Sequence, residues 1–444
     1  MKVIQSLGWY FPESTGGSEI YVSSLIADLL KLSIESGVVA PTNGTGEQQY
    51  MHSGASVFRY PVTARRSRVQ RVGSAPHTGF DRFERWLDSQ SADIYHQHSW
   101  TYGCGIHHLQ AAQRRGMATV LTVHVPGLVC LRGTMLKDGA TPCDGQIRER
   151  ECAHCWLQQR GMPAAGRAML GSMPAALGSR LRFLGKAGTA LAATSLVQRH
   201  RMALLQAAEA ADHVVAVCQW LHDALLRNGV PAHKLSLNRQ GVASAPALAN
   251  ECEKRSDGSP LVVGFLGRWD PLKGLGVLVQ AVLRLPADIP FELHIHAVES
   301  QDPDMARHMH SVRAAAAGSP RIKLFPALAP DAVPAFLRSI DLLAVPSQWF
   351  ETGPLVALEA FAMGTPVIGS DLGGISELVR HGQNGWLVRH DDVSAWTAAL
   401  GQLARQPALL PRLRQGIGPV RTMRDVALET RSLYFELLQS KAST

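Results

Sequence analysis

Two glutamates stand eight positions apart, Glu351 and Glu359, in the segment VPSQWFETGPLVALEAFAMGTPVIGSDLGGISELV. The apolar run before Pro346 predicts a strand, a Thr-Gly pair interrupts it, and Pro354 suits the first turn of a helix. We expect Glu351 in the connecting loop and Glu359 on the helix about two turns further on. One carboxylate can then hold a sugar while the other accepts hydrogen bonds from ribose hydroxyls. Without the surrounding Gly and Pro residues, a solvated helix face would explain two such carboxylates equally well.

Two cations follow the predicted strand that opens the second half of the chain. Arg268 and Lys273 lie in FLGRWDPLKGLGVL, where open α/β sheets bind ligands beyond the carboxyl ends of their strands. A charge about 4 Å from a phosphate oxygen is worth roughly 4 kcal/mol at an effective dielectric of about 20, before desolvation. This pair could therefore stabilise the negative charge that grows on a departing diphosphate. The alternative is that both are ordinary surface cations.

The first half offers a glycine pair and a histidine. Gly16 and Gly17 follow the first predicted strand and precede a helix that begins near Ser18, so their amides can approach a phosphate or a sugar. A simple turn is the alternative for such a pair. His124 ends the predicted strand ATVLTVH and could donate or accept a hydrogen bond at the edge of the sheet. The other strand-end histidines, in DIYHQHS, are interpreted as structural.

Short apolar runs alternate with helical stretches throughout the chain, which is typical of parallel α/β units. The first series comprises MKVIQSL, SGVVAP, ASVFRYPV, DIYHQH, ATVLTVH and HVVAVC. The periodicity stops in APALANECEKRSDGSP, between Ala243 and Pro260, and a second series follows with LVVGFLG, FELHIHA, RIKLFPA, IDLLAVPS, TPVIGSD and NGWLVR. We expect helices to begin in this half near Leu275, Pro303, Asp331 and Pro354. The predicted domains are 1–245, 256–415 and a terminal helical segment at 416–444.

These motifs together resemble family 4 of the retaining glycosyltransferases, whose E-x7-E pair handles the donor. The resemblance rests on the segment around Glu351 and Glu359, on the basic pair, and on PESTGGSEIYVSSL in the first half. It implies a GT-B fold, in which two Rossmann-like, doubly wound domains face a central cleft and the last helix crosses back onto the first domain. It assigns catalysis to Glu351, His124, Arg268 and Lys273. It assigns substrate binding to Gly16, Gly17, Gly353, Pro354, Leu355 and Glu359.

The resemblance implies retaining transfer of a sugar from a nucleotide-sugar donor to a glycan or lipid-linked acceptor in polysaccharide biosynthesis. We expect no catalytic metal, and the departing phosphate would help to deprotonate the acceptor. Alternatives are a non-catalytic nucleotide-sugar-binding or scaffolding protein of the same fold and a nucleotide-sugar epimerase. Ala297 and Val298 stand where relatives often have a small glycine-containing turn, so the donor base stays open.

Four of the seven cysteines, Cys130, Cys143, Cys152 and Cys155, fall in one segment that ends in CAHC. Four thiolates with a terminal C-x2-C are a common tetrahedral zinc set. We expect a structural zinc that stabilises an insertion at about 127–190. Unliganded thiols, an iron–sulfur cluster and a redox pair are the alternatives.

The 444 residues are too long for one compact core and carry a net charge of +8. No cleavage-type signal or long apolar run is present in the sequence, so we expect a cytoplasmic protein with reduced thiols. The stretch between Glu151 and Glu209 contains no acidic residue, which suggests contact with an anionic membrane surface, although a solvated basic face explains it equally well. Its basic residues are Arg160, Arg167, Arg180, Arg182, Lys186, Arg199 and Arg201, and a smaller cluster comprises Arg65, Arg66, Arg68 and Arg71. No nucleic-acid-binding module is recognisable, so no nucleic-acid partner is expected.

Overall fold

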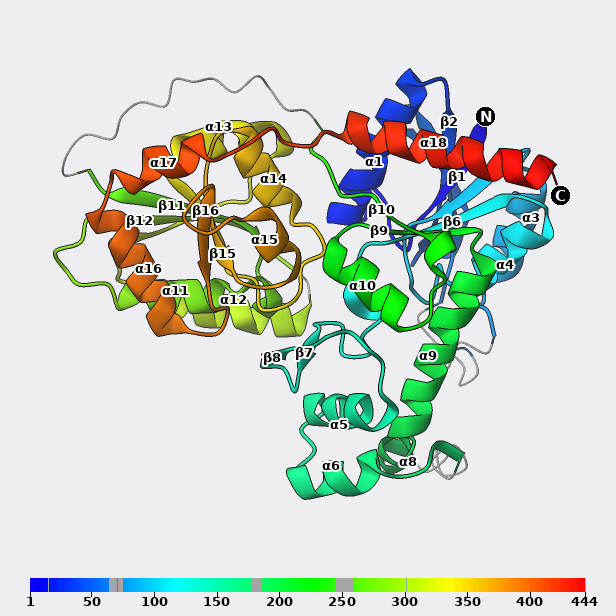
Figure 1. Ribbon diagram of the computed structural model, residues 1–444, viewed down its shortest axis with the longest axis horizontal. Coiled ribbons are helices and arrows are strands. Elements are labelled where there is room, and N and C mark those ends of the chain that lie inside the picture. Colours follow the sequence, from blue (N-terminus) through cyan, green and yellow to red (C-terminus); the bar gives the residue numbers. More distant parts are fainter. Residues whose placement is uncertain are drawn as a thin grey trace. The chain divides into compact units, whose positions relative to one another are not determined.

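The computed structural model describes residues 1–14, 16–63, 70, 75–176, 185–243, 259–300 and 302–443. The chain divides into two compact units (Figure 1): Met1–Ala243 together with Met423–Thr444, and Ser244–Thr422. The linker predicted between Ala243 and Pro260 lies almost wholly outside the described residues, since 244–258 are not among them. Both units are built around a largely parallel sheet with helical connections.

The sheet of the first unit has eight strands in the order β10-β9-β6-β5-β1-β2-β4-β3. Its strands are β1 (Lys2–Ser6), β2 (Glu35–Thr42), β3 (Gln48–His52), β4 (Ala55–Pro61), β5 (Ile94–Gln97), β6 (Ala118–Val123), β9 (His213–Ala216) and β10 (Leu235–Leu237). Every pairing is parallel except that of β3 with β4. All six residues of β6 are buried, as expected for a strand covered on both faces. The apolar runs predicted six of these strands and missed the polar β3 and the three-residue β10.

The helices of the first unit are α1 (Gly17–Lys31), α3 (Phe80–Asp88), α4 (Ile106–Arg114), α5 (Glu149–Gln159), α6 (Ala164–Gly171), α8 (Gly185–Leu191), α9 (Ala193–Ala210), α10 (Gln219–Arg227) and α18 (Met423–Ala442). Short 3-10 helices are η1 (Pro126–Leu128) and η2 (Ala232–Lys234), and a two-stranded sheet pairs β7 (Leu136–Lys137) with β8 (Thr141–Pro142). Helix α18 packs across α1 (Figure 1), and its buried Met423, Val426 and Tyr434 join the same hydrophobic cluster as Tyr21 and Leu25 of α1.

The sheet of the second unit is parallel throughout and has the order β13-β12-β11-β14-β15-β16. Its strands are β11 (Leu261–Arg268), β12 (Phe291–Val298), β13 (Ile322–Phe325), β14 (Leu342–Val345), β15 (Val367–Ser370) and β16 (Gly385–Val388). Its helices are η3 (Pro271–Lys273), α11 (Leu275–Leu283), α12 (Pro303–Ala316), η4 (Pro330–Ala332), α13 (Val333–Ser339), α14 (Leu355–Ala362), α15 (Gly373–Leu378), α16 (Val393–Arg405) and α17 (Leu409–Gln415). Predicted helix starts at Leu275 and Pro303 match these bounds, and the other two begin within two residues of the prediction.

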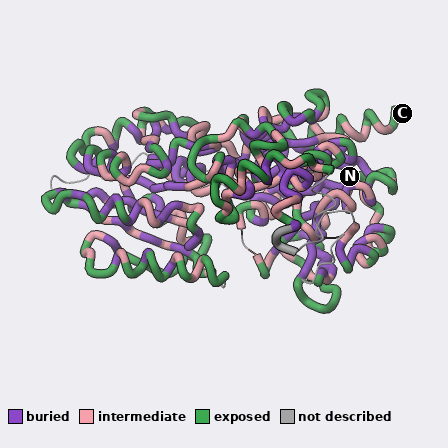
Figure 2. Tube along the Cα trace, turned by 90° about the horizontal axis from the view of Figure 1, so that it is seen from below, coloured by how far each residue is buried: buried purple, intermediate pink, exposed green. Residues whose placement is uncertain are grey.

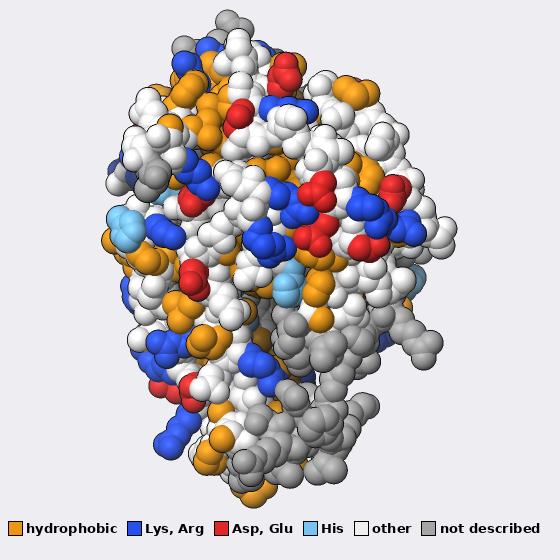
Figure 3. All heavy atoms as spheres, turned by 90° about the vertical axis from the view of Figure 1, so that its right-hand side faces the viewer, with side chains coloured by type: hydrophobic (Ala, Val, Ile, Leu, Met, Phe, Trp, Pro, Cys, Tyr) orange, Lys and Arg blue, Asp and Glu red, His pale blue; other side chains and the backbone are white. Residues whose placement is uncertain are grey.

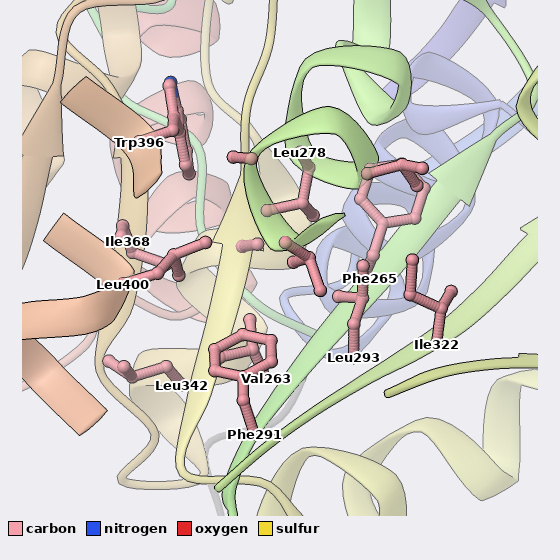
Figure 4. Packing of buried hydrophobic residues seen from close by; sticks show 14 of the residues in the cluster. Val263, Phe265, Leu278, Phe291, Leu293, Ile322, Leu342, Ile368, Trp396 and Leu400 are labelled. Carbon is pink, nitrogen blue, oxygen red and sulfur yellow. The ribbon is translucent and has the colours of Figure 1, made fainter. Parts of the chain in front are cut away.

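A continuous apolar core supports the sheet of the second unit. Val263 and Phe265 of β11 pack with Leu293 of β12 and with Leu278 of α11 (Figure 4). Trp396 of α16 is fully buried there, and its indole Nε1 donates to the Arg389 carbonyl at 3.1 Å. Truncating a buried Trp of this kind costs about 3–5 kcal/mol, so Trp396 contributes strongly to the stability of the second unit.

Burial in both units follows the strands and the helix faces that are turned towards them (Figure 2). On the face in Figure 3, Lys and Arg side chains lie interspersed with Asp and Glu. Among the described helices, none combines the length and the apolar character needed to cross a bilayer.

Candidate functional site

Glu351 accepts three hydrogen bonds on one carboxylate oxygen. Lys273 Nζ donates to Glu351 Oε1 at 2.7 Å, and Ser347 Oγ and Trp349 Nε1 donate to the same oxygen at 2.8 Å each. The Glu351 residue is only 6% exposed, and the Lys273 ammonium also lies 5.6 Å from the centre of the Trp349 ring. The structure therefore brings two of the predicted site residues into one ion pair whose geometry is fixed by neighbouring side chains.

Two loops at the carboxyl ends of β11 and β14 hold this pair. Asp270 caps η3 by accepting from Leu272 N at 2.9 Å, and Gln348 N of the second loop donates to the Leu272 carbonyl at 2.7 Å. Gly274 has φ of 73°, and a Cβ built on it would lie 1.7 Å from the Pro346 carbonyl oxygen. Only glycine permits such an approach, so the residue after Lys273 lets the two loops touch.

The other predicted residues of the second unit lie near these loops but make different contacts. Arg268, at the end of β11, has a side chain that is 56% exposed and pairs with Asp270 at 3.4 Å. Its guanidinium is thus largely available to an anion.

The start of α14 follows Glu351. Pro354 is the N-cap residue of α14, between the half-buried Gly353 and Leu355. Backbone N–H groups at such a helix start favour an anionic ligand. Glu359 lies half-buried on α14, where burial raises the pKa of its carboxyl.

His124 directly follows β6 and is 5% exposed. Its Nε2 lies 3.1 Å from His98 Nδ1, and the Tyr21 ring packs edge-on against it at 4.7 Å between centroids. Burial lowers the pKa of His124 to about 3, so the ring is neutral at neutral pH. The sequence analysis interpreted His98 as structural and did not predict a contact with His124. The structure shows a direct contact between them.

Gly16 is the N-cap of α1, and Gly17 is the first residue of this helix. A Cβ on Gly16 would lie 2.8 Å from the Glu19 carboxylate, which also accepts a hydrogen bond from Ser14 Oγ. A ligand that approaches Gly16 therefore meets a carboxylate. This arrangement favours the hydroxyl groups of a sugar over a phosphate, and Glu19 is a residue that sequence reasoning missed.

The four predicted zinc ligands line one cavity of about 50 Å³ in the first unit. Cys130 follows η1, Cys143 follows β8, and Cys152 and Cys155 stand one turn apart on α5. Arg148 N donates to Cys152 Sγ at 3.4 Å. Burial raises the pKa of the Cys152 thiol to about 11, and the other three thiols add to the increase.

A metal-binding geometry is nevertheless not formed. Within the described ranges, no group of three or more His, Cys, Asp and Glu side chains is arranged to hold a metal ion.

A larger cavity, of about 590 Å³, also lies in the first unit, between the loop after β5, α4 and α9. Its lining includes Trp100, Tyr102, His107, Gln110, Arg199 and Gln206. Flat aromatic faces beside amide and guanidinium groups suit a polar, hydroxyl-rich ligand. No sequence motif indicated this cavity, because its walls come from separate elements.

Comparison with known proteins agrees with the two-unit architecture. A family described as "Glycosyl transferases group 1" matches residues 260–406, and one described as "Glycosyl transferase 4-like domain" matches residues 16–241. A D-inositol 3-phosphate glycosyltransferase from Rhodococcus opacus is 38% identical over 159 residues, which cover 34% of this chain and 35% of that protein. The chain thus spans about a third of the length of this relative.

Solved structures extend the similarity to the whole fold. Sucrose-phosphate synthase from Thermosynechococcus elongatus aligns over 99% of this chain and 100% of that chain, with a TM-score of 0.66 and 19% identity. Anabaena HepE in complex with UDP aligns over 100% of both chains, with a TM-score of 0.57 and 15% identity. At these identities the likeness concerns the fold alone, and it is the GT-B fold that the sequence predicted. This chain belongs to the group 1 glycosyltransferases of family 4.

Proposed function

We propose that this chain is a retaining glycosyltransferase that transfers a sugar from a nucleotide-sugar donor to a glycan or lipid-linked acceptor in polysaccharide biosynthesis. The observation that carries the proposal is the Lys273–Glu351 pair, because Ser347 and Trp349 fix it at the carboxyl ends of β11 and β14. Ligands of open α/β sheets bind at this edge.

Each predicted residue has a role in this proposal. Arg268 and Lys273 stabilise the diphosphate as its charge grows, together with the backbone N–H groups of Gly353 and Leu355, on either side of Pro354 at the start of α14. Glu351 accepts from sugar hydroxyls and orients Lys273, while Glu359 accepts from the ribose. In the first unit, His124 and the segment Gly16–Gly17 contact the transferred sugar.

The retaining step needs no separate protein base. The bond between the anomeric carbon and the phosphate oxygen breaks, a bond to the acceptor oxygen forms on the same face, and the acceptor proton passes to the departing phosphate. The cavity of about 590 Å³ in the first unit supports an acceptor rich in hydroxyl groups. An epimerase or a scaffolding protein would bind the nucleotide sugar without glycosylating an acceptor.

The first experiment is thermal unfolding with UDP, GDP, ADP and their common sugar conjugates. A ligand at 100 times its dissociation constant stabilises the folded chain by about 2.7 kcal/mol, so one nucleotide series should raise the melting temperature. Glu359→Ala should lose most of this shift. The control Asp304→Ala, whose side chain is 80% exposed, should keep it. No shift with any nucleotide would contradict the proposed donor site.

Product analysis then separates the candidate functions. With the stabilising donor and a panel of glycan and lipid-linked acceptors, we expect a product with the anomeric configuration of the donor. Inversion would refute the retaining mechanism, and an epimerised donor without transfer would favour the epimerase.

We also propose a structural zinc at Cys130, Cys143, Cys152 and Cys155, supported by their shared cavity. The backbone N–H of Arg148 contacts Cys152 Sγ at 3.4 Å, and hydrogen bonds of this kind commonly support a metal-bound thiolate. Elemental analysis of the purified protein should find about one zinc per chain. Cys152→Ser should lose it, and Cys218→Ser, which alters a buried cysteine elsewhere in the unit, should retain it. Metal-free wild-type protein would refute the site.

We further propose a cytoplasmic protein that contacts anionic membrane surfaces through the basic segment after Glu151. The proposal rests on the absence of acidic residues between Glu151 and Glu209. In the described part of this segment, Arg160 stacks on Trp156 and Arg167 lies 3.9 Å from Asp138. Arg180 and Arg182 lie outside the described residues, as do Arg65, Arg66, Arg68 and Arg71, and the side chain of Lys186 is not described. Binding to anionic liposomes at low salt, lost at high salt, is the expected result. Absence of binding at low salt would refute the proposal.

A further inference from the structure

A buried chain of hydrogen bonds joins His124 to α18. His124 Nε2 contacts His98 Nδ1 at 3.1 Å, and His98 Nε2 contacts Gln5 Oε1 at 2.8 Å. Gln5 Nε2 donates to the Tyr434 hydroxyl at 3.4 Å, and this hydroxyl lies 2.6 Å from His96 Nδ1. Every member is at most 5% exposed. These hydrogen bonds therefore link the ends of three neighbouring strands, β1, β5 and β6, with α18, which follows them in sequence by hundreds of residues.

The partners determine where the protons lie. Gln5 Oε1 can only accept, so His98 Nε2 carries its proton. Burial lowers the pKa of His98 well below its usual range, so the ring has a single N–H and its Nδ1 accepts. His124 Nε2 must then donate to that atom, which leaves His124 Nδ1 as a lone-pair acceptor. The orientation of one amide thus fixes the tautomer of a histidine two contacts away.

Tyr434 holds the amide in this orientation. The Gln5 NH2 group donates to the phenol oxygen, which leaves the phenol proton for His96 Nδ1, and His96 Nε2 then donates to Thr122 Oγ1 at 2.7 Å. A reversed amide would require the phenol, His96, His98 and His124 all to exchange donor and acceptor roles. Because these groups are buried, a partial exchange would leave an unsatisfied polar atom.

We propose that Gln5, held by Tyr434, is a positioning residue that keeps His124 in the Nε2–H tautomer. Its Nδ1 is then an acceptor rather than a donor, which sets the kind of hydrogen bond that the His124 ring can make on that side. The effect on transfer rests on the proposed function, whereas the tautomer itself does not. Residues of α18 thus act on the candidate site without contacting a substrate.

The test measures tautomers and kinetics on the full chain. We would record ¹⁵N NMR spectra of the histidine rings in wild type, Gln5→Met and Tyr434→Phe. The control is Tyr95→Phe, which removes another fully buried phenol of the unit whose hydroxyl donates to Ser6 Oγ at 2.7 Å. Wild type and control should show His98 and His124 protonated at Nε2. Gln5→Met and Tyr434→Phe should both show an Nδ1–H population at His124.

With the donor identified above, Tyr434→Phe should lower kcat about tenfold at an unchanged KM for the donor, and Tyr95→Phe should leave both constants near wild type. Removal of one hydrogen bond of about 1.4 kcal/mol corresponds to this factor of ten. The inference would be overturned by an Nδ1–H tautomer of His124 in the wild type, or by unchanged tautomers in both Gln5→Met and Tyr434→Phe. Tautomer shifts in a chain that transfers no sugar would support the inference and refute the proposed function instead.

Discussion

The two units organise polar groups at the ends of their strands by opposite means. In the second unit, a charged pair, Lys273 and Glu351, is held by two loops that touch at Gly274. In the first unit, neutral histidines are joined through Gln5 to α18. A charged pair can stabilise a phosphate, whereas a neutral chain can only orient donors and acceptors. The comparison shows that buried polar side chains can be fixed either by an ion pair, as in the second unit, or by hydrogen bonds between neutral rings and an amide, as in the first.

We expect the largest difference in stability between the two units at acidic pH. His96 and His124 have pKa values lowered to about 3 by burial, against an ordinary value of 6.5. Their contribution to stability is therefore complete above pH 6.5, and it is lost as the pH falls from 6.5 towards 3, because the unfolded chain binds protons first. For each of the two histidines, the free energy of unfolding of the first unit should fall by about 2 kcal/mol between pH 7 and pH 5.

Hydrogen exchange followed by mass spectrometry, corrected for intrinsic rates, measures this loss for each unit. We expect peptides of β1, β5 and β6 to lose protection at pH 5 before those of β11 and β14. Equal loss in both units would remove the proposed contrast.

Glu351→Ala should break the charged pair and lower the free energy of unfolding of the second unit by about 3 kcal/mol, since Lys273, Ser347 and Trp349 lose one common acceptor. Transfer should be almost abolished while free nucleotide still binds. Denaturant unfolding and nucleotide titration check both statements. Glu351→Gln keeps an acceptor and should recover part of the stability. Full turnover by the Ala variant would contradict the assigned role.

Gly274→Ala tests whether loop contact positions the pair. The added Cβ would meet the Pro346 carbonyl oxygen at 1.7 Å, and φ of 73° is strained for alanine, so we expect a loss of about 2 kcal/mol. Gly318→Ala has a similar φ, 84°, but nothing within 4 Å of its Cβ. It should cost only about 1 kcal/mol, and the difference between the two variants isolates the loop contact. Equal losses would show that the close approach is unimportant.

Arg268→Ala should have the smallest effect on stability, within about 0.5 kcal/mol, because the side chain is 56% exposed. Transfer should nevertheless fall, since the guanidinium is proposed to face the diphosphate. Arg307→Ala, which removes another exposed Arg that pairs with a nearby Asp, should change neither quantity. A normal transfer rate for Arg268→Ala would leave Lys273 as the sole proposed cation.

The sequence predicted the second unit better than the first for a physical reason. Lys273 and Glu351 each follow a buried strand closely, so neighbouring strand ends bring them together and local spacing reveals them. Gln5 and Tyr434 are 429 positions apart, and their contact depends on how α18 packs. A buried Gln in an apolar strand was the available signal, because its amide must find partners. The strand β3 was missed because its sequence, QQYMH, is polar, and β10 was missed because it has only three residues.

The packing of α18 also affects the order in which the chain can fold during synthesis. The core of the first unit includes Met423, Val426, Ala427 and Tyr434, yet most of this unit leaves the ribosome before residues 244–422. A nascent chain therefore presents Tyr21 and Leu25 without their α18 partners until the second unit has been made. The second unit is contiguous and can fold as soon as it emerges. The first unit is thus the first to be synthesised and the last to complete its folding. Its uncovered apolar face is where we expect a chaperone to bind the growing chain.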